Sequence, residues 1–388
     1  MAAIREFTVP TKIKYGYGAA KNIGALIKEL GGKSALIVTD PGLVRAGLLK
    51  TIRSILQSDG IQFSCYDQVE PNPSIENVEA CFEVYRQNNP DVIVGLGGGS
   101  SIDTAKAVAV LATNGGRIQD YEGYNKVTKP KKTVIAIPTT AGTGSEVTAS
   151  SVITDRKRQI KMAIISFNVI PEYALVDPEL TLSVPPALTA STGMDALTHA
   201  IESYVSKDAI PQSEAFALHA IRLISRSLRR AVFDGDNRVA RDDMMMGSLL
   251  AGMAFAISKL GNVHAMAHPL GGVFNIPHGI ANAVLLPYVM KFNALACPEK
   301  FADIAAAMGA DIRGLTQREA AFKAVELVRE LNADIGIPDN LSCLGVTSTA
   351  LDKLCEDTMR SGNVLVNPRK TTIEDIRKLY EAAIAGAL

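Results

Sequence analysis

The sequence of 388 residues contains no tryptophan and only five cysteines, and it has no excess of charge of either sign. With 40 basic and 40 acidic residues, it lacks the positive balance of proteins that bind nucleic acids or anionic membranes, so neither is an expected partner. No stretch approaches ~18 uncharged apolar residues, the length of a membrane-spanning helix. The segment MAAIREFTVPTKIKYGYG carries charges early and has no apolar run typical of a signal peptide.

The cysteines are odd in number, scattered along the chain and never in CxxC spacing. A disulfide framework or a thiolate zinc site uses paired or closely spaced cysteines. The distribution therefore indicates reduced thiols in a cytoplasmic protein. The positions are Cys65, Cys81, Cys297, Cys343 and Cys355.

The first half of the chain alternates short β-rich runs with helical patterns. Strands alternating with helices of this length predict a Rossmann-like parallel sheet that is covered on both faces. Two further runs, 150–155 and 160–165, are joined by a charged turn and predict an antiparallel β-hairpin appended to that sheet. The expected strands are 34–40, 61–67, 91–99 and 133–138, and the expected helices are 47–60, 77–89 and 101–114.

From about residue 185 onward, the pattern is almost entirely helical. The length of the chain also suits two domains of ordinary size. The sequence therefore predicts an α/β domain, residues 1–182, and an all-α domain, residues 183–388. The clearest helical patterns are 187–206, 212–233, 240–258 and 319–336.

Four of the five histidines lie between residues 195 and 278, in the helical half of the chain. Asp195 and His199 have i,i+4 spacing, which places both side chains on one face of a helix. His264 and His268 repeat that spacing. The two pairs therefore predict two helices that each present two polar groups in one direction.

His278 is expected in a turn rather than in a helix interior, because Pro277 and Gly279 flank it. Pro269 and the glycine pair after it are expected to end the preceding helix. One carboxylate and up to four imidazoles can converge from two helices and a loop, which is a divalent transition-metal site without thiolates. A single helical histidine is more often a core or surface residue, and spacing leaves open which histidine is not a ligand. His219 has no partner at ligand spacing and is interpreted as structural.

The stretch GLGGGSSIDTAK leaves a buried strand and enters a helix. Adjacent glycines let the backbone approach a ligand, Ser100 or Ser101 can cap the helix, and the N–H groups at its start favour a phosphate or pyrophosphate. The stretch only approximates the dinucleotide fingerprint, and a tight strand–helix turn is the alternative interpretation.

Two other loops follow strands of the predicted sheet. Asp40 stands at the carboxyl end of the first strand, where an acid can accept hydrogen bonds from ribose hydroxyls and repel a 2′-phosphate. The stretch PTTAGTGSE follows another strand, either as a ligand loop or as a loop without function. A doubly wound sheet binds its ligand at such carboxyl ends, and an acid before the glycine loop indicates a variant of the common order. The hydroxyl-bearing residues of the loop are Thr139, Thr140, Thr143 and Ser145.

Six motifs together resemble those of the iron-containing (group III) alcohol dehydrogenases: GGGSSIDTAK, IPTTAGTGSEVT, VDPEL, TGMDALTHAIESY, VHAMAHPLGG and PHGIANAVLLP. The resemblance extends from the N-terminal strand to about residue 380, and relatives include 1,3-propanediol, lactaldehyde and NAD-dependent methanol dehydrogenases. It implies a metal-dependent, NAD(H)-linked oxidoreductase that interconverts a small primary alcohol and its aldehyde. A homodimer or larger homo-oligomer is expected.

The resemblance also implies roles for individual residues. A divalent metal is expected on Asp195, His199, His264 and His278, with His268 as the catalytic histidine between metal and nicotinamide. Fe²⁺ is expected from the family, although the ligand set also suits Zn²⁺, Mn²⁺, Co²⁺ or Ni²⁺. The residues expected at NAD(H) are Asp40, Asn72, Gly97, Gly98, Gly99, Ser100, Thr139, Thr140, Thr143 and Lys161.

The expected chemistry combines a Lewis-acid metal at the alcohol or carbonyl oxygen with hydride transfer to or from nicotinamide. One alternative is a lyase or cyclase on the related dehydroquinate-synthase scaffold. Such an enzyme handles phosphorylated substrates and would line the helical domain with lysine and arginine, which are almost absent from the metal-binding segment. Another alternative, a non-catalytic metal-binding protein, does not explain why nucleotide loops and metal ligands are both present.

The segment FAISKLGNVHAMAH, which leads to His264, departs from the pattern of the relatives that the chain resembles. They commonly have an Asn and a Gly where Ile257 and Lys259 stand here. A lysine near the substrate would favour a polar or anionic substrate end, whereas a solvent-facing lysine would have no such effect. Ser150 and Phe255 are further candidate substrate residues.

Overall fold

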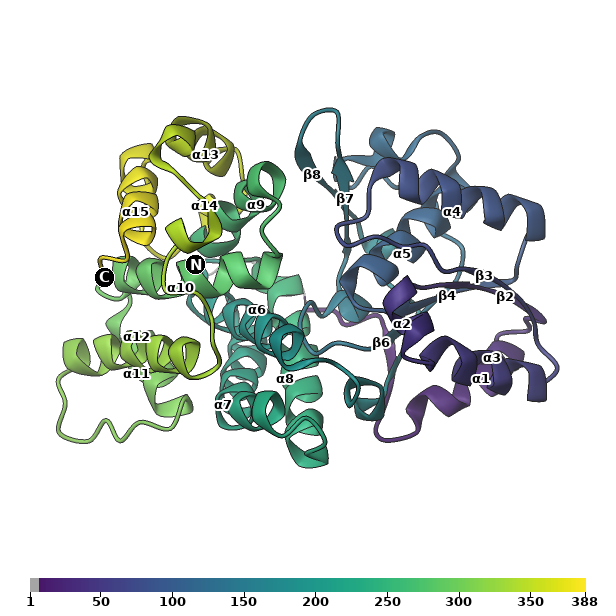
Figure 1. Cartoon of the computed structure of the whole chain (residues 1–388), viewed down its shortest axis with the longest axis horizontal. Helices are drawn as coiled ribbons and strands as arrows, with labels where there is room; N and C mark the ends of the chain where they lie inside the picture. The colour runs from purple at the N-terminus through teal and green to yellow at the C-terminus, as the bar shows by residue number, and fades with distance from the viewer. Residues whose placement is uncertain (1–6) are drawn as a thin grey trace. The chain divides into compact units, whose positions relative to one another are not determined.

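The computed structural model describes residues 7–388. Residues 1–6 lie outside the described residues, and so does that part of the predicted N-terminal domain and of the N-terminal stretch without a signal-peptide pattern. The described chain divides into two compact units, Val9–Val184 and Pro185–Leu388, and residues 7 and 8 belong to the second (Figure 1). The domain limits expected from the sequence, 1–182 and 183–388, stay a prediction.

Within the described residues, the unit Val9–Val184 contains a six-stranded parallel sheet with the strand order β1-β9-β6-β4-β2-β3. The predicted Rossmann-like architecture is therefore confirmed. The strands are β1 (Lys12–Tyr15), β2 (Ser34–Val38), β3 (Gln62–Tyr66), β4 (Val92–Gly97), β6 (Val134–Pro138) and β9 (Tyr173–Val176). The helices are α1 (Ile23–Glu29), α2 (Pro41–Arg45), α3 (Leu48–Ser58), α4 (Ile75–Asn88) and α5 (Gly99–Asn114), with 3-10 turns at η1 (Ala19–Asn22), η2 (Ile118–Tyr121), η3 (Ser145–Val147), η4 (Phe167–Val169) and η5 (Pro178–Thr181).

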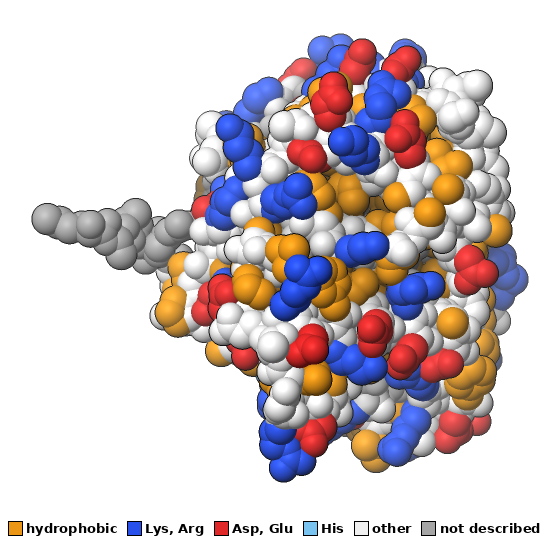
Figure 2. Space-filling model, turned by 90° about the vertical axis from the view of Figure 1, so that its left-hand side faces the viewer, with side chains coloured by type: hydrophobic (Ala, Val, Ile, Leu, Met, Phe, Trp, Pro, Cys, Tyr) orange, Lys and Arg blue, Asp and Glu red, His pale blue; other side chains and the backbone are white. Residues whose placement is uncertain are grey.

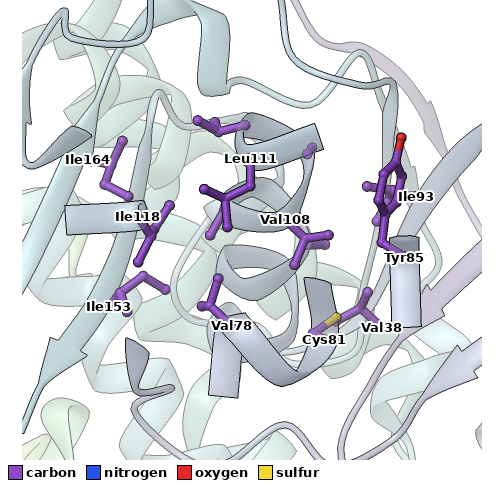
Figure 3. Packing of buried hydrophobic residues seen from close by; sticks show 14 of the residues in the cluster. Val38, Val78, Cys81, Tyr85, Ile93, Val108, Leu111, Ile118, Ile153 and Ile164 are labelled. Atoms are coloured by element: carbon purple, nitrogen blue, oxygen red, sulfur yellow. The ribbon is translucent and has the colours of Figure 1, made fainter. Parts of the chain in front are cut away.

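Alternation along β2 shows why both faces of the sheet are covered. Successive side chains of a strand point to opposite faces. Leu36 and Val38 pack with α4 and α5 in one buried cluster, part of which Figure 3 shows. Ile37 packs with α1 and α3 in a second cluster on the other face. The apolar runs of the first half are therefore buried from both sides, as in other parallel sheets.

The predicted hairpin forms, because β7 (Ser150–Asp155) pairs antiparallel with β8 (Ile160–Ile165). The prediction that it extends the main sheet was wrong. The hairpin belongs to a separate three-stranded sheet in the described chain, where β8 also pairs with β5 (Gly123–Tyr124). The edge strands of the main sheet are instead β1, which pairs with β9, and β3. Strands of two to four residues, such as β5 and β9, are too short to show a period in the sequence.

The unit that begins at Pro185 contains helices and no strand among the described residues, as predicted. Its apolar residues recur at helical spacing, and the helices bury those faces against one another. The helices are α6 (Pro186–Val205), α7 (Pro211–Phe233), α8 (Arg238–Ser258), α9 (Asn262–Phe274), α10 (His278–Asn293), α11 (Pro298–Ala307), α12 (Gln317–Asp334), η6 (Ser342–Leu344), η7 (Ser348–Ala350), α13 (Leu351–Met359), α14 (Asn363–Val366) and α15 (Ile373–Ala385).

Helix α9 continues through Pro269, so the prediction that this proline and the glycine pair after it end the helix was wrong. A proline inside a helix removes one N–H donor and crowds the preceding turn. Here the buried hydroxyl of Tyr380 donates to the carbonyl of Met266, at 2.7 Å, and supports this part of the helix from α15. That long-range contact has no signature in the sequence.

On the face of the molecule in Figure 2, lysine and arginine lie interspersed with aspartate and glutamate, and neither sign gathers in one area. In the part of the chain that the structure describes, no single helix has both the length and the apolar composition to cross a membrane. The pair α8 and α9, bent by 103°, reaches these limits only when the two helices are counted together.

Candidate functional site

Helix α6 supplies two of the expected metal ligands from one face. Asp195 and His199 lie one turn apart and are almost completely buried. The ring of Phe255, from α8, stacks on the ring of His199 with a centroid distance of 4.5 Å. Packing against an aromatic ring restricts the rotamers of His199 and directs its Nε2 toward Asp195, which lies 3.9 Å away at Oδ1.

Helix α9 brings His264 to the same carboxylate. His264 is the third residue of α9, and its Nε2 lies 3.7 Å from Oδ1 of Asp195. The rings of His199 and His264 are stacked, with their centroids 4.6 Å apart. One ligand atom from each of Asp195, His199 and His264 lies within 4.8 Å of the others, and all three side chains are buried.

His278 approaches Asp195 from a third helix. It is the first residue of α10, so the predicted turn was wrong, although the residue is not in a helix interior, as predicted. Its Nε2 lies 3.6 Å from Oδ1 of Asp195. Gly279 makes this approach feasible, because a Cβ at that position would stand 2.2 Å from the carbonyl oxygen of Ser191 in α6.

The spacing of these atoms fits a metal ion. Four ligands placed tetrahedrally at ~2.1 Å from a metal lie ~3.4 Å from one another. The three nitrogens lie 3.6–3.9 Å from the same aspartate oxygen, only slightly farther apart than that. The geometry therefore accommodates a divalent ion after small shifts of the side chains.

The electrostatics of the cluster also favour a cation. Burial by itself would raise the pKa of Asp195, but the imidazoles of His199, His278 and His264 hold that pKa far below its usual range. Burial opposes the charged form of His264, but hydrogen bonds to Asp195 and Glu202 outweigh it and raise the pKa of His264 to about 9. Two buried carboxylates thus favour positive charge between them, which a proton or a metal ion can supply.

Two residues at this site were missed by the sequence analysis. One is Glu202, whose Oε2 lies 2.6 Å from Nδ1 of His264. The amide nitrogen of Asn282 lies 2.7 Å from Oδ1 of Asp195 and 3.1 Å from Nε2 of both His264 and His278. Their spacing could have revealed them, since Glu202 stands seven residues after Asp195 and Asn282 stands four after His278.

His268 lies beside this cluster. It follows His264 by one turn of α9, and its ring is stacked on that of His278 with the centroids 5.4 Å apart. The ring centroids of His264 and His268 are 6.3 Å apart. His268 is half-buried, whereas His264 is fully buried. The structure thus groups His268 with the other three histidines but does not include it in the tight three-residue set.

In the α/β unit, the three predicted loops follow neighbouring strands. β2, β4 and β6 are adjacent in the sheet, so Asp40, the glycine loop and the threonine loop lie at one edge. The backbone N–H of Thr139 donates to the carbonyl of Gly97 at 3.0 Å. The position that a Cβ would take on Gly98 is 3.1 Å from Oγ1 of Thr140.

Helix α5 begins without a side-chain cap, so the prediction that Ser100 or Ser101 caps it was wrong. Gly98 occupies the N-cap position. The hydroxyl of Ser101 is buried and has no hydrogen-bond partner among the described residues. The first N–H groups of the helix are therefore not occupied by a side-chain cap, and helix starts of this kind bind phosphate groups.

The side chain of Asp40 caps the start of helix α2. Its Oδ1 accepts hydrogen bonds from the N–H groups of Gly42 and Leu43, at 2.8 and 3.1 Å, and so caps α2. Its Oδ2 lies 3.4 Å from the position that a Cβ would take on Gly97. One oxygen thus supports the helix and the other faces the glycine loop.

Gly99 is a position where the two loops approach closely. A Cβ built there would lie 2.8 Å from Cγ2 of Thr143. We expect Gly99→Ala to push the loops apart and to weaken NADH binding about tenfold, because overpacking of this size costs about 1–3 kcal/mol. Fluorescence titration with NADH measures the effect. Thr113→Ala, on the exposed far end of α5, is the control, and Thr143→Ser in the Gly99→Ala background should restore part of the affinity.

Below these loops, α5 is tied to the segment that follows the threonine loop. Lys106 is fully buried, and its Nζ donates to Oγ of Ser145, to Thr148 and to the carbonyl of Ser150. Asp103 accepts from Oγ of Ser145 at 2.6 Å. Burial lowers the pKa of Lys106 to about 8, against the opposing field of Asp103 and Glu146. The sequence analysis assigned no role to Asp103 or Lys106, although both residues are in the motif GGGSSIDTAK.

The remaining expected residues of this unit lie on the hairpin and on the turn beside it. Nζ of Lys161, in β8, donates to Oδ1 of Asn72 at 2.9 Å. The hydroxyl of Thr154, in β7, donates to the backbone carbonyl of Asn72. Ser150 is the first residue of β7, and its carbonyl is bonded to Lys106. The structure thus brings Asn72 and Lys161 together and places Ser150 in the α/β unit.

Comparison with known proteins gives the family. The family model described as "Iron-containing alcohol dehydrogenase" matches residues 10–178. The family model described as "Fe-containing alcohol dehydrogenase family, C-terminal" matches residues 189–384. The chain is 46% identical over 380 residues to the 1,3-propanediol dehydrogenase of Citrobacter freundii, covering 97% of this chain and 98% of the relative. It is 41% identical over 379 residues to the NAD-dependent methanol dehydrogenase of Bacillus methanolicus, covering 98% and 100%. The crystal structure of a 1,3-propanediol oxidoreductase superposes with a TM-score of 0.96 at 45% identity, covering 98% and 100% of the two chains.

A Rossmann-like unit followed by a helical unit with a carboxylate–histidine cluster, in a chain with these relatives, defines an NAD-dependent oxidoreductase whose family implies a metal of the iron type. The chain belongs to the iron-containing alcohol dehydrogenase family. This membership favours an alcohol or aldehyde oxidoreductase over a lyase on the dehydroquinate-synthase scaffold.

Proposed function

We propose that this enzyme interconverts a small primary alcohol and its aldehyde with NAD(H), and that Asp195, His199, His264 and His278 hold its metal. The observation that carries the proposal is the buried group of Asp195, His199 and His264, whose ligand atoms lie within 4.8 Å of one another. The names of the relatives support short alcohols as substrates, since they act on 1,3-propanediol and methanol.

The metal is proposed to be Fe²⁺, with Zn²⁺, Mn²⁺, Co²⁺ or Ni²⁺ as alternatives that the same ligands accept. When bound, such an ion supplies Lewis-acid polarisation of the substrate oxygen. The protein's contribution is a pre-arranged set of one carboxylate and three imidazoles, of which Asp195, His199 and His264 are almost completely buried. The ring of Phe255, stacked on that of His199, covers one side of this ligand.

His268 is proposed as the catalytic histidine. Its ring lies next to the ligand His278 and is more exposed than that of His264. An imidazole in this place can give or take the proton that accompanies alcohol–aldehyde interconversion. This role suits a group that is near the substrate oxygen but is not itself a ligand.

The cofactor is proposed to bind at the three loops of the parallel sheet and at Lys161 with Asn72. Support comes from the close approach of the glycine and threonine loops, the uncapped start of α5 and the unpartnered hydroxyl of Ser101. The proposed contact residues are Asp40, Asn72, Gly97, Gly98, Gly99, Ser100, Thr139, Thr140, Thr143 and Lys161. A cytoplasmic location and a homodimer or larger homo-oligomer are proposed with them, from composition and family resemblance.

A substrate with a polar or anionic end stays a proposal that depends on Lys259, with Ser150 and Phe255 as further candidates. Nζ of Lys259 donates to Oδ2 of Asp208 at 2.7 Å, and about half of the lysine side chain is exposed. Its charge is therefore balanced by a carboxylate. A substrate anion would have to compete with Asp208 for this ammonium group.

Lys259→Gly tests both the backbone conformation of this residue and its proposed contact with the substrate. Its backbone has φ 60° and ψ −169°, a conformation adopted almost only by glycine. We expect the variant to be more stable by about 1 kcal/mol, because relief of strain is partly offset by the freedom of glycine in the unfolded chain. If Lys259 contacts the substrate, the preference for a short charged aldehyde over propanal should also fall. Thermal unfolding and the ratio of kcat/KM values measure both effects.

The function itself is tested by following the absorbance of NADH with a panel of short aldehydes. Turnover should stop after chelation and return with Fe²⁺ or Zn²⁺. No turnover with any aldehyde or alcohol, in protein that has been loaded with metal, would contradict the proposal.

A further inference from the structure

Helix α6 extends its functional face beyond the two ligands. Asp195, His199 and Glu202 stand at positions i, i+4 and i+7, which share one side of a helix. Glu202 is 4% exposed, so its carboxylate lies as deep in the helical unit as the ligands do. A buried carboxylate is costly unless its oxygens are used, and both oxygens of Glu202 are used.

The two oxygens of Glu202 hold the first turn of α9. Oε1 accepts the backbone N–H of Val263 at 2.6 Å, and Oε2 lies 2.6 Å from Nδ1 of His264. The first N–H groups of a helix have no partner within it, so the contact to Val263 anchors the start of α9. The contact from Oε2 to Nδ1 holds the imidazole of His264 on the side opposite to Asp195.

The turn between α8 and α9 closes around this carboxylate. A Cβ on Gly261 would lie 2.9 Å from Oε1 of Glu202. The neighbouring residue Ser203 contacts Ser258, the last residue of α8 before this turn, with their hydroxyl oxygens 2.6 Å apart. The end of α6 therefore fixes both the path of the chain into α9 and the ring that follows.

We propose that Glu202 is a positioning residue that sets the tautomer and orientation of His264, so that Nε2 presents its lone pair to the metal. The inference rests on the proposed metal site. In the neutral ring, the form that binds a metal, a hydrogen on Nδ1 that Oε2 accepts leaves Nε2 deprotonated, and Nε2 faces Asp195 and His199. Carboxylates that accept from metal-bound histidines also increase the basicity of the ring, and their loss typically weakens metal binding about 10- to 100-fold.

A purely structural role would be limited to the anchor on α9. Glu202→Gln distinguishes the two roles, since its amide oxygen can still accept from Val263. Its NH₂ group then faces Nδ1 of His264 and donates to it, which places the ring hydrogen on Nε2 and blocks that atom as a ligand. The variant thus keeps the anchor and reverses the tautomer.

The experiment measures Zn²⁺ affinity of the metal-free protein by competition with a chromophoric chelator. We expect Glu202→Gln to lower the affinity about 10- to 100-fold, while the unfolding midpoint of the metal-free protein changes by no more than about 4 °C. Ser203→Ala is the matched control, because it contacts the same turn but not His264, and it should leave Zn²⁺ affinity unchanged.

Glu202→Asp gives an independent measurement if Glu202→Gln fails to fold. The shorter side chain keeps the charge but cannot hold both contacts, so an intermediate loss of Zn²⁺ affinity is expected. Zn²⁺ affinity within twofold of the unsubstituted protein, in either folded variant, would overturn the positioning role and leave the metal site intact. Failure of the unsubstituted protein to bind Zn²⁺ would overturn the proposed metal site together with it.

Discussion

Replacement of His264 by alanine is expected to lower kcat/KM about a thousandfold or more, because loss of a ligand removes the metal, whose Lewis-acid effect is worth several kcal/mol. The same loss is expected for Asp195→Ala and His199→Ala. Binding of NADH should persist, since the proposed nucleotide loops belong to the unit Val9–Val184, which folds around its own core.

The measurements are metal content, kcat/KM and NADH affinity of each purified variant. Asp195→Asn keeps the shape of the side chain but removes its charge, and it should lose metal as Asp195→Ala does. His219→Ala, an exposed histidine on α7, is the control and should behave like the unsubstituted protein. A variant with full metal content and normal turnover would remove that residue from the site.

A preference for NAD(H) over NADP(H) on the order of a hundredfold in kcat/KM is the second large effect that we expect. The carboxylate of Asp40 would accept hydrogen bonds from the ribose 2′-hydroxyl, whereas a 2′-phosphate would meet like charge. Asp40→Gly should relax the preference to within about tenfold, because it removes that repulsion.

Asp40 also caps α2, so a loss of structure has to be separated from a loss of charge. Asp40→Asn does this, since asparagine caps a helix about as well as aspartate does. We expect Asp40→Asn to relax the cofactor preference with no change in thermal stability. Equal efficiency with both cofactors in the unsubstituted protein would sink the claim, and an unchanged preference in Asp40→Asn would make Asp40 a helix cap only.

The local signals of the sequence predicted this fold well because they are strong and repeated. Leu36, Ile37 and Val38 form a short apolar run between turn signals, which is typical of a strand covered on both faces, and they pack on both sides of the sheet. Asp195 and His199 are one helical turn apart, so any helix through them presents both on the same side. Where the signal was a single residue, it misled: Pro269 lies within α9, and His278 starts a helix.

The sequence by itself determined the two kinds of architecture, the motif resemblance and the chemical types that gather at the candidate metal site. Only the tertiary structure decided which atoms meet. Glu202 and His264 are 62 residues apart, and Asn282 and Asp195 are 87 apart, yet both pairs are within hydrogen-bond distance. Helical period relates residues a few positions apart, whereas such contacts depend on how closely helices pack, as where Gly279 lets α10 approach α6. The residues that hydrogen-bond to the proposed metal ligands can therefore be identified only from the packing of the helices.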